Sequence, residues 1–214
     1  MTTDPAAPVA AFDVDGTLTT VDTFVRFVRR VAGARAYTAA LGAAPLAVAV
    51  VAGRASRDRL KARVVASVFG GRDAAIVADA GRAHAEQMQQ RWVRADTVAR
   101  LHWHRAEGHR IVLVSASLRP YLDPFGEWLG ADDVICTDLG AGADGRLDGT
   151  LVGGNCRGPA KAERLLAHLG GRPSELWAYG DSEGDRELLA LADHPCLLAR
   201  NTKIDAAPAR ADTR

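Results

Sequence analysis

Two aspartates, Asp13 and Asp15, lie two residues apart at the end of a short apolar run and directly before Gly16. Side chains at positions i and i+2 of a strand leave the same face, so both carboxylates are expected to project together beyond the strand. Adjacent negative charges repel unless a divalent cation, a shared proton or an oriented electrophile holds them. An Asx-type turn would explain one aspartate before a glycine but not two. We therefore interpret the pair as catalytic.

A serine follows a second apolar run, Arg110–Val114, in the segment Ser115-Ala116-Ser117. The segment is expected to lead directly into a helix. A serine hydroxyl and free backbone N–H groups at a helix start form a site for an anion such as a phosphoryl group. We expect Ser115 and Ala116 to contact that anion, and Ser117 to cap the helix.

A lysine, Lys161, lies near the start of a helix expected over Pro159–Leu169. Proline is favoured in the first turn of a helix. A cation at this position opposes the helix dipole at a cost of roughly a few tenths of a kcal/mol, unless an anion or a carboxylate lies nearby. Taken alone, Lys161 would be interpreted as a surface lysine. Its place just before an acidic loop favours a role in the site.

The acidic loop carries three carboxylates within five residues, Asp181, Glu183 and Asp185, next to two glycines that permit a tight turn. These charges would repel strongly without a cation, and hard oxygen donors suit Mg²⁺. Asp181 is the best-placed ligand. Asp185 is expected to be a further ligand or the partner of one, and Glu183 to face solvent.

The residues that must position these groups form an alternating pattern of strands and helices. Short apolar runs predict buried parallel strands at Val9–Val14, Arg110–Val114, Val134–Thr137 and Leu176–Tyr179. In an open parallel sheet, ligands collect beyond the carboxyl ends of the strands, where the aspartate pair, the serine and the acidic loop lie. The pattern predicts an α/β fold with a Rossmann-like parallel sheet flanked by helices.

Residues of roughly 22 to 95 show helical spacing and almost no strand signal. We expect an all-helical cap at 21–96, inserted after the first strand into a core made of 1–20 and 97–214. The glycine-punctuated segment Asp138–Val152 predicts a hairpin or a turn-rich excursion. The polar tail from Asn201 onward is expected to be frayed.

Composition narrows the function classes. The 214 residues, 48% of them hydrophobic, suit one domain with an insert, and a net charge of +1 gives no footprint for nucleic acid. Three cysteines without metal-site spacing favour a reduced, cytoplasmic setting, and Met1–Pro8 lacks the pattern of a secretory signal. The chain gives no indication of oligomeric state.

One uncharged segment, Ala36–Gly53, is apolar enough to raise the question of a membrane. It is shorter than the roughly 20 apolar residues that a spanning helix needs, and Pro45 interrupts it. A buried or partner-facing helical hairpin is the favoured interpretation. Weak contact with a membrane surface is the alternative.

The order of these motifs resembles that of the haloacid dehalogenase superfamily. Its four motifs match Asp13-Val14-Asp15-Gly16-Thr17, Ser115, Lys161 and the loop from Gly180-Asp181 through Asp185. The helical insert resembles the cap of the phosphoserine phosphatase-like branch. The resemblance implies a Mg²⁺-dependent phosphatase that acts on a small phosphorylated metabolite through an aspartyl phosphate.

Residue roles follow from the same resemblance. Asp13 would attack phosphorus, and Asp15 would protonate the leaving oxygen and then activate water. Asp13, the backbone carbonyl of Asp15 and Asp181 would hold Mg²⁺, while Ser115 and Lys161 would bind the phosphoryl oxygens. Dehalogenases of the superfamily lack the second aspartate and the metal, so Asp15 argues against dehalogenation.

The substrate is less defined by the resemblance. Asp22 and Arg63 resemble the amine-binding and carboxylate-binding residues of phosphoserine phosphatases, but they are equally interpreted as a helix cap and a solvated charge. Ala116-Ser117 and Gly184 depart from the pattern of those enzymes. The uncharged segment resembles one in bacterial phosphatidylglycerophosphate phosphatases, which suggests a lipid or polyprenyl phosphate. A phosphotransferase with the same intermediate, or a non-catalytic binding protein, are the further alternatives.

Overall fold

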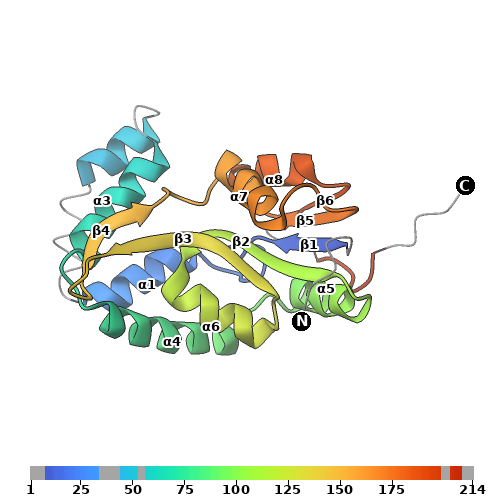
Figure 1. The fold of residues 1–214 in the computed structure, drawn as a ribbon, viewed down its shortest axis with the longest axis horizontal. Helices are drawn as coiled ribbons and strands as arrows, with labels where there is room; N and C mark the ends of the chain where they lie inside the picture. Colours follow the sequence, from blue (N-terminus) through green and yellow to red (C-terminus); the bar gives the residue numbers. More distant parts are fainter. Residues whose placement is uncertain (1–7, 34–43, 53–55, 199–202, 209–214) are drawn as a thin grey trace, which may run out of the picture.

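The sheet has six strands in the order β4-β3-β2-β1-β5-β6 in the computed structural model, which describes residues 8–33, 44–52, 56–198 and 203–208 (Figure 1). Five strands are parallel, and β4 is antiparallel to β3. The bounds are β1 Val9–Phe12, β2 Arg110–Leu118, β3 Asp133–Ala141, β4 Leu147–Val152, β5 Leu176–Gly180 and β6 His194–Leu197. The predicted α/β class is confirmed, whereas β6 was not predicted.

Helices cover both faces of this sheet. Helices α7 (Pro159–Leu169) and α8 (Arg186–Leu191) lie on one face, and α5 (Ala95–Ala106) and α6 (Arg119–Leu129) lie on the other (Figure 1). A single turn of 3₁₀ helix, Glu183–Asp185, precedes α8. The central strand β1 is buried along its whole length, as parallel strands with two covered faces must be.

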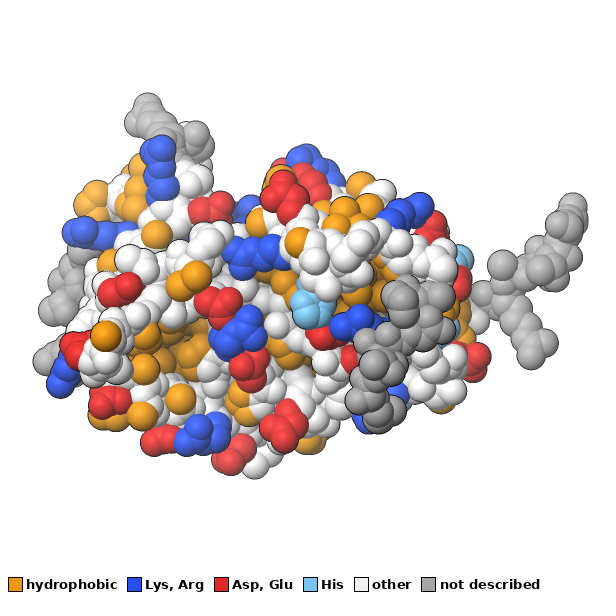
Figure 2. All heavy atoms as spheres, viewed as in Figure 1, with side chains coloured by type: hydrophobic (Ala, Val, Ile, Leu, Met, Phe, Trp, Pro, Cys, Tyr) orange, Lys and Arg blue, Asp and Glu red, His pale blue; other side chains and the backbone are white. Residues whose placement is uncertain are grey.

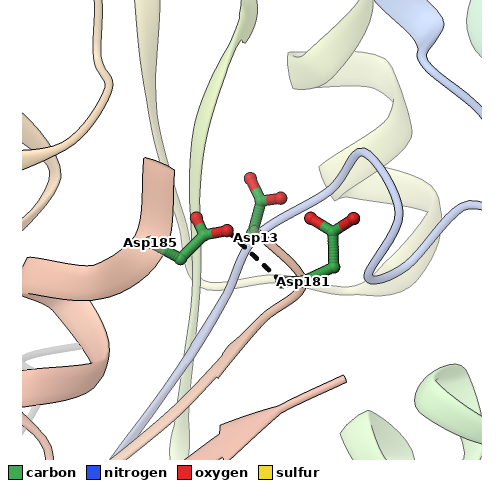
Figure 3. A group of neighbouring side chains, drawn as sticks. All are labelled: Asp13, Asp181 and Asp185. Carbon is green, nitrogen blue, oxygen red and sulfur yellow. Dashed lines mark hydrogen bonds between the residues drawn. The ribbon is translucent and has the colours of Figure 1, made fainter. Parts of the chain in front are cut away.

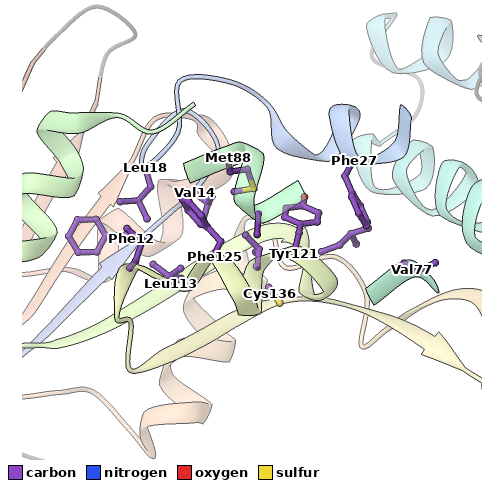
Figure 4. Packing of buried hydrophobic residues seen from close by; sticks show 14 of the residues in the cluster. Phe12, Val14, Leu18, Phe27, Val77, Met88, Leu113, Tyr121, Phe125 and Cys136 are labelled. Carbon is purple, nitrogen blue, oxygen red and sulfur yellow. The ribbon is translucent and has the colours of Figure 1, made fainter. Parts of the chain in front are cut away.

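The predicted cap region is helical. It contains α1 (Thr23–Ala32), a helical segment over residues 44–51, α3 (Arg57–Phe69) and α4 (Ala74–Arg91). Helix α4 packs so closely on α6 that a Cβ added at Gly81 would lie 2.1 Å from the carbonyl oxygen of Pro120. Residues of α1 and α4 belong to the same buried cluster as residues of β1 and α6 (Figure 4). Part of the predicted cap therefore shares the core of the sheet.

The predicted hairpin is formed by β3 and β4, and it supports α3. The N–H of Gly71 donates to the carbonyl of Leu147 (2.7 Å), and the N–H of Leu147 donates to the carbonyl of Arg72 (2.8 Å). Strand β3 runs past the predicted end at Thr137 because it continues into the pairing with β4. The end of α3 is thus hydrogen-bonded to the hairpin.

The prediction of a frayed tail is wrong for residues 203–206. The buried guanidinium of Arg100 donates to the carbonyl oxygens of Asp205 and Ala206, and the N–H of Ile204 donates to Asp96 (3.0 Å). The polarity of the tail gave no sign of this because its partners bind backbone atoms rather than side chains.

No helix among the described residues is long and apolar enough to cross a membrane. Of the segment Ala36–Gly53, residues 44–52 are described, and the others lie outside the described residues. Two valines of this part, Val48 and Val51, are 69% and 90% exposed. On the face shown in Figure 2, acidic and basic side chains are interspersed, which agrees with the near-zero net charge.

Candidate active site

The predicted catalytic residues line one cavity of about 690 Å³ at the carboxyl ends of β1, β2 and β5. Its lining includes Asp13, Asp15, Ser115, Ala116, Lys161, Asp181 and Asp185, and also Asp22. The parallel pairing that places them there continues just beyond β1, where the N–H of Asp13 donates to the carbonyl of Tyr179 (2.9 Å). The strand ends therefore bring together residues from four separate segments of the chain.

Lys161 lies between two carboxylates and is 2% exposed. Its Nζ donates to Oδ1 of Asp13 (2.5 Å) and to Oδ1 of Asp185 (2.5 Å). Burial alone would lower the pKa of Lys161, but the negative charges of Asp13 and Asp185 outweigh burial and raise it. The ammonium therefore stays charged, and the interpretation of Lys161 as a surface lysine is wrong.

Asp13 is buried beside that ammonium. Burial raises the pKa of its carboxyl to about 7, with a further contribution from the charge of Asp185, while Lys161 acts in the opposite direction. A carboxylate that costs free energy to desolvate is stabilised by an additional cation. The electrostatics at Asp13 thus favour binding of a positive ion in the cavity.

Asp185 fixes the acidic loop from inside. Its Oδ2 accepts hydrogen bonds from the N–H of Asp181 (3.3 Å), the N–H of Ser182 (3.1 Å) and the hydroxyl of Ser182 (3.0 Å). With Oδ1 bound to Lys161, both oxygens of this buried carboxylate have partners. Such a carboxylate is better suited to shaping the loop than to direct metal binding, a role that the sequence left open.

Three carboxylates surround one space, as Figure 3 shows for Asp13, Asp181 and Asp185. One ligand atom of each lies within 4.8 Å of the others. Burial and the charge of Asp185 raise the pKa of Asp181 to about 6. The Asp181 carboxyl lies against Gly16, which has φ +82°, and a Cβ there would lie 2.0 Å from the Asp181 oxygen. Oxygen donors of this kind fit Mg²⁺.

Asp15 has different partners from Asp13. Its Oδ1 accepts from the hydroxyl (2.5 Å) and the N–H (2.9 Å) of Thr23, and its Oδ2 accepts from the hydroxyl of Ser117 (2.7 Å). Burial and the charge of Asp22 raise the pKa of Asp15, and the Thr23 and Ser117 hydrogen bonds oppose that shift. The Asp15 carboxyl is therefore held between Thr23 of the predicted cap and Ser117 of β2, in the same cavity as the three-carboxylate group.

Thr23 and Ser117 were not identified as site residues from the sequence. Ser117 lies two residues after Ser115, so the i, i+2 relation that grouped the aspartates could have found it. The prediction that Ser117 caps a helix is wrong, because β2 continues to Leu118, which pairs with Thr137. Thr23 carries no comparable signal, since only folding of α1 onto β2 brings it to Asp15.

Ser115 is buried and lines the catalytic cavity with Ala116. Its hydroxyl accepts the N–H of Ser117 (3.1 Å). The segment belongs to the strand rather than to a helix start, since α6 begins at Arg119 without a side-chain cap. The helix begins at Arg119, within the Leu118-Arg119-Pro120 segment expected to open it, and the Ser115 hydroxyl lies four residues before it on the strand.

Asp22 and Arg63 have different positions relative to the cavity. Asp22 caps α1 by accepting the N–H of Val25 (3.0 Å), and it also lines the catalytic cavity. Arg63 is exposed and is not among the residues that line the cavities described here. The structure therefore does not bring Arg63 to the site.

Lys61, from the same helix as Arg63, reaches the core instead. Its Nζ donates to the carbonyl of Ala116 and to Oδ1 of Asn155 (2.7 Å). Burial lowers the pKa of Lys61 to about 8, although nearby acidic groups, Asp15 first among them, act in the opposite direction. Helix α3 thus places Lys61 beside Ala116 and its first residue, Arg57, in the lining of the catalytic cavity, and neither was predicted.

Comparison with known proteins agrees with this arrangement. The family model for haloacid dehalogenase-like hydrolases matches residues 10–190. Protein CicA of Caulobacter vibrioides is 40% identical over 185 residues, which is 86% of this chain and 83% of CicA. A Bordetella pertussis structure of unknown function has a TM-score of 0.72 at 20% identity, with 86% of each chain covered. A phosphoserine phosphatase from T. onnurineus has a TM-score of 0.59 at 21% identity, and the match covers 90% of this chain and 84% of that structure's chain. The two structures show a shared fold.

Proposed function

The chain belongs to the haloacid dehalogenase-like hydrolase family, and on that premise we propose that it is a Mg²⁺-dependent phosphatase that hydrolyses phosphate monoesters through an aspartyl phosphate on Asp13. The single observation that carries the proposal is the group of Asp13, Asp181, Asp185 and Lys161 in one cavity. A phosphoserine phosphatase among the similar folds is consistent with a small phosphorylated metabolite as substrate.

Asp13 is the proposed nucleophile. A carboxylate oxygen would form a bond to phosphorus while the bond between phosphorus and the ester oxygen breaks. Lys161 donates a hydrogen bond to Oδ1 of Asp13, and this bond fixes the direction of Oδ2, the second carboxylate oxygen of Asp13. The ammonium of Lys161 and the hydroxyl of Ser115 would neutralise and orient the phosphoryl oxygens.

Asp15 is the proposed acid and base. Its raised pKa increases the fraction that carries a proton near neutral pH, which suits donation to the departing oxygen. The resulting carboxylate would then take a proton from the water that hydrolyses the aspartyl phosphate. Thr23 and Ser117 hold the carboxyl group in place through both steps.

A magnesium ion fits the oxygen donors of this cavity. We infer that Asp13, Asp181 and the backbone carbonyl of Asp15 would hold it, with Asp185 orienting the loop. When bound, Mg²⁺ would supply positive charge that offsets the charge of the transferring phosphoryl group.

Turnover of p-nitrophenyl phosphate tests the proposal. We expect activity that requires Mg²⁺, disappears in excess EDTA and falls by at least about a thousandfold in Asp13→Asn. Glu183→Gln is the matched control, because Glu183 is exposed in the same acidic loop and lines neither cavity. Activity that survives in Asp13→Asn would refute the proposal. Adding an acceptor alcohol and analysing the products separates hydrolysis from phosphotransfer.

A further inference from the structure

A second cavity, of about 1010 Å³, adjoins the catalytic cavity between α1, α3 and the helical segment over 44–51. We call it the chamber. The two cavities share the lining residues Asp15, Asp22, Arg57, Ala116 and Arg157. Because Asp15 is the proposed proton donor to the departing oxygen, this shared wall lies where the alcohol part of a substrate leaves the catalytic cavity.

The chamber is lined mainly by apolar side chains. They come from three helical segments and are Phe24, Val25, Val28, Leu60, Val64, Ala47, Val50 and Val51. Val25 and Val51 are 44% and 90% exposed, so part of this lining faces water. Apolar surface gathered around a concave space is typical of a ligand site, and water in contact with it is displaced favourably by an apolar group.

Most polar groups of the chamber lie at its end near the catalytic cavity, and the exposed Arg29 of α1 is a further lining cation. Lys61 lies there, bonded to Ala116 and Asn155, and its Nζ lies 4.9 Å from the centroid of the Phe24 ring. Arg57 and Arg157 belong to the shared wall. From Asp13 outward, the surroundings therefore change from the acidic catalytic cavity, through a shared wall that carries both carboxylates and cations, to mainly apolar side chains.

We propose that the chamber binds the hydrocarbon part of the substrate, and that the enzyme acts on phosphate monoesters of alcohols with an aliphatic chain. This inference rests on the proposed function. The phosphoryl group would lie at Asp13, the ester oxygen at Asp15 and the chain beyond Lys61. Cleavage of the bond between phosphorus and the ester oxygen, with a proton from Asp15, would release the long-chain alcohol. Water would then return Asp13 and inorganic phosphate.

Straight-chain alkyl phosphates test this assignment. We expect kcat/KM in Mg²⁺ to rise from ethyl through butyl to octyl phosphate, by up to about threefold to fourfold for each methylene that enters the chamber. Val25→Asp and Val51→Asp are expected to flatten this dependence, and both positions are exposed enough to tolerate the change. Val152→Asp is the matched control, because Val152 is 56% exposed on β4 and lines neither cavity.

Binding of alkyl phosphonates, measured by calorimetry, tests the chamber without turnover. Octyl phosphonate is expected to bind the wild-type protein more tightly than ethyl phosphonate. The ratio of their dissociation constants should match the ratio of kcat/KM between octyl and ethyl phosphate. Hydrolysis of ethyl phosphate with no chain-length dependence in either assay would overturn the inference and leave the proposed function standing. Chain-dependent binding without hydrolysis of any ester would overturn the proposed function instead.

A membrane surface is the competing explanation for the exposed valines. Sedimentation with phosphatidylglycerol vesicles examines it with the same variants. Binding to vesicles that is lost in Val25→Asp and Val51→Asp, together with a flat chain-length series in solution, would overturn the inference. A rising series with no vesicle binding supports it.

Discussion

In the catalytic cavity, two buried carboxylates share one buried ammonium, whereas in the adjoining chamber side chains such as Phe24, Val28 and Val64 offer only apolar surface. Each buried charge in the catalytic cavity is stabilised by its oppositely charged neighbours, because an unpaired charge inside a protein lowers the free energy of unfolding. Apolar surface in the second region is less demanding, since volume-conserving exchanges cost little. The comparison suggests that the chemistry is fixed by the ionic network and that the alcohol is selected by residues that can vary.

The largest effect is expected for Lys161→Met, which removes the shared cation. Asp13 and Asp185 would remain buried without their shared cation, so we expect activity to fall by at least about a thousandfold and the free energy of unfolding by about 3 to 5 kcal/mol. Kinetics with p-nitrophenyl phosphate and urea unfolding measure both. The double variant Lys161→Met with Asp185→Asn should regain stability but not activity. Equal stability of the single variant and the wild type would contradict the importance of the network.

Asp181→Asn separates metal binding from folding. Asp181 is exposed, so Asp181→Asn is expected to leave the unfolding midpoint nearly unchanged. Because it removes a proposed ligand, it should weaken Mg²⁺ binding by at least about a hundredfold, the upper range for residues that only support a ligand. Isothermal titration with Mg²⁺ measures the affinity, with Glu183→Gln as the control. Unchanged affinity in Asp181→Asn would remove it from the ligand set.

Protonation of His84 should make the free energy of unfolding depend on pH. Its Nε2 bonds the carbonyl of Thr23 (3.1 Å), and burial lowers its pKa from 6.5 to about 4. Since the unfolded chain takes up the proton near pH 6.5, this contribution to stability is present above that pH and is lost as pH falls toward 4. We expect about 2 kcal/mol to be lost over this range. The raised pKa of Asp13 acts in the opposite direction over this range, so the difference between wild type and His84→Gln, each unfolded at pH 7 and pH 4.5, measures the His84 contribution. Equal pH dependence of the two proteins would contradict it.

Ser117→Ala gives the smallest expected effect, about a tenfold lower kcat. The Ser117 hydroxyl stabilises the charged form of Asp15, so removing it should raise the pKa of Asp15 further. The basic form would then appear at higher pH, and the acidic limb of the pH–rate profile should move upward. Ser67→Ala is the control, since Ser67 is exposed on α3. A lower kcat with an unmoved profile would mean that Ser117 acts through packing alone.

Much of the fold could be predicted from local pattern. Short apolar runs located four strands, and the helix at Pro159–Leu169 was predicted with the bounds that the structure has. Strand β6 was not predicted because the tetrapeptide His194–Leu197 contains a proline and a single large aliphatic residue. The α/β class followed from the alternation of strands and helices.

Site residues could be predicted where the spacing along a strand decides which way a side chain points. They could not be predicted where the rotation of a helix about its axis decides it. Asp13 and Asp181 follow the ends of β1 and β5, Ser115 lies in the last half of β2, and all three line the expected cavity. Residues two apart on a helix point in different directions, and this is why Lys61 is buried at the site and Arg63 is exposed. The apolar spacing of α3 places Lys61 on the same face as the buried Val65 and Val68, but a hydrophobic pattern does not predict a cation on that face.

The anchoring of residues 203–206 by Arg100 has a practical consequence. The N–H of Ile204 is bound to Asp96, which pairs with Arg94, and Arg94 in turn donates to the carbonyl of Gly16 beside the catalytic aspartates. Lys203 lines the catalytic cavity. Arg100→Ala, which removes the hydrogen bonds to Asp205 and Ala206, would therefore loosen a segment that forms part of the wall of the catalytic cavity.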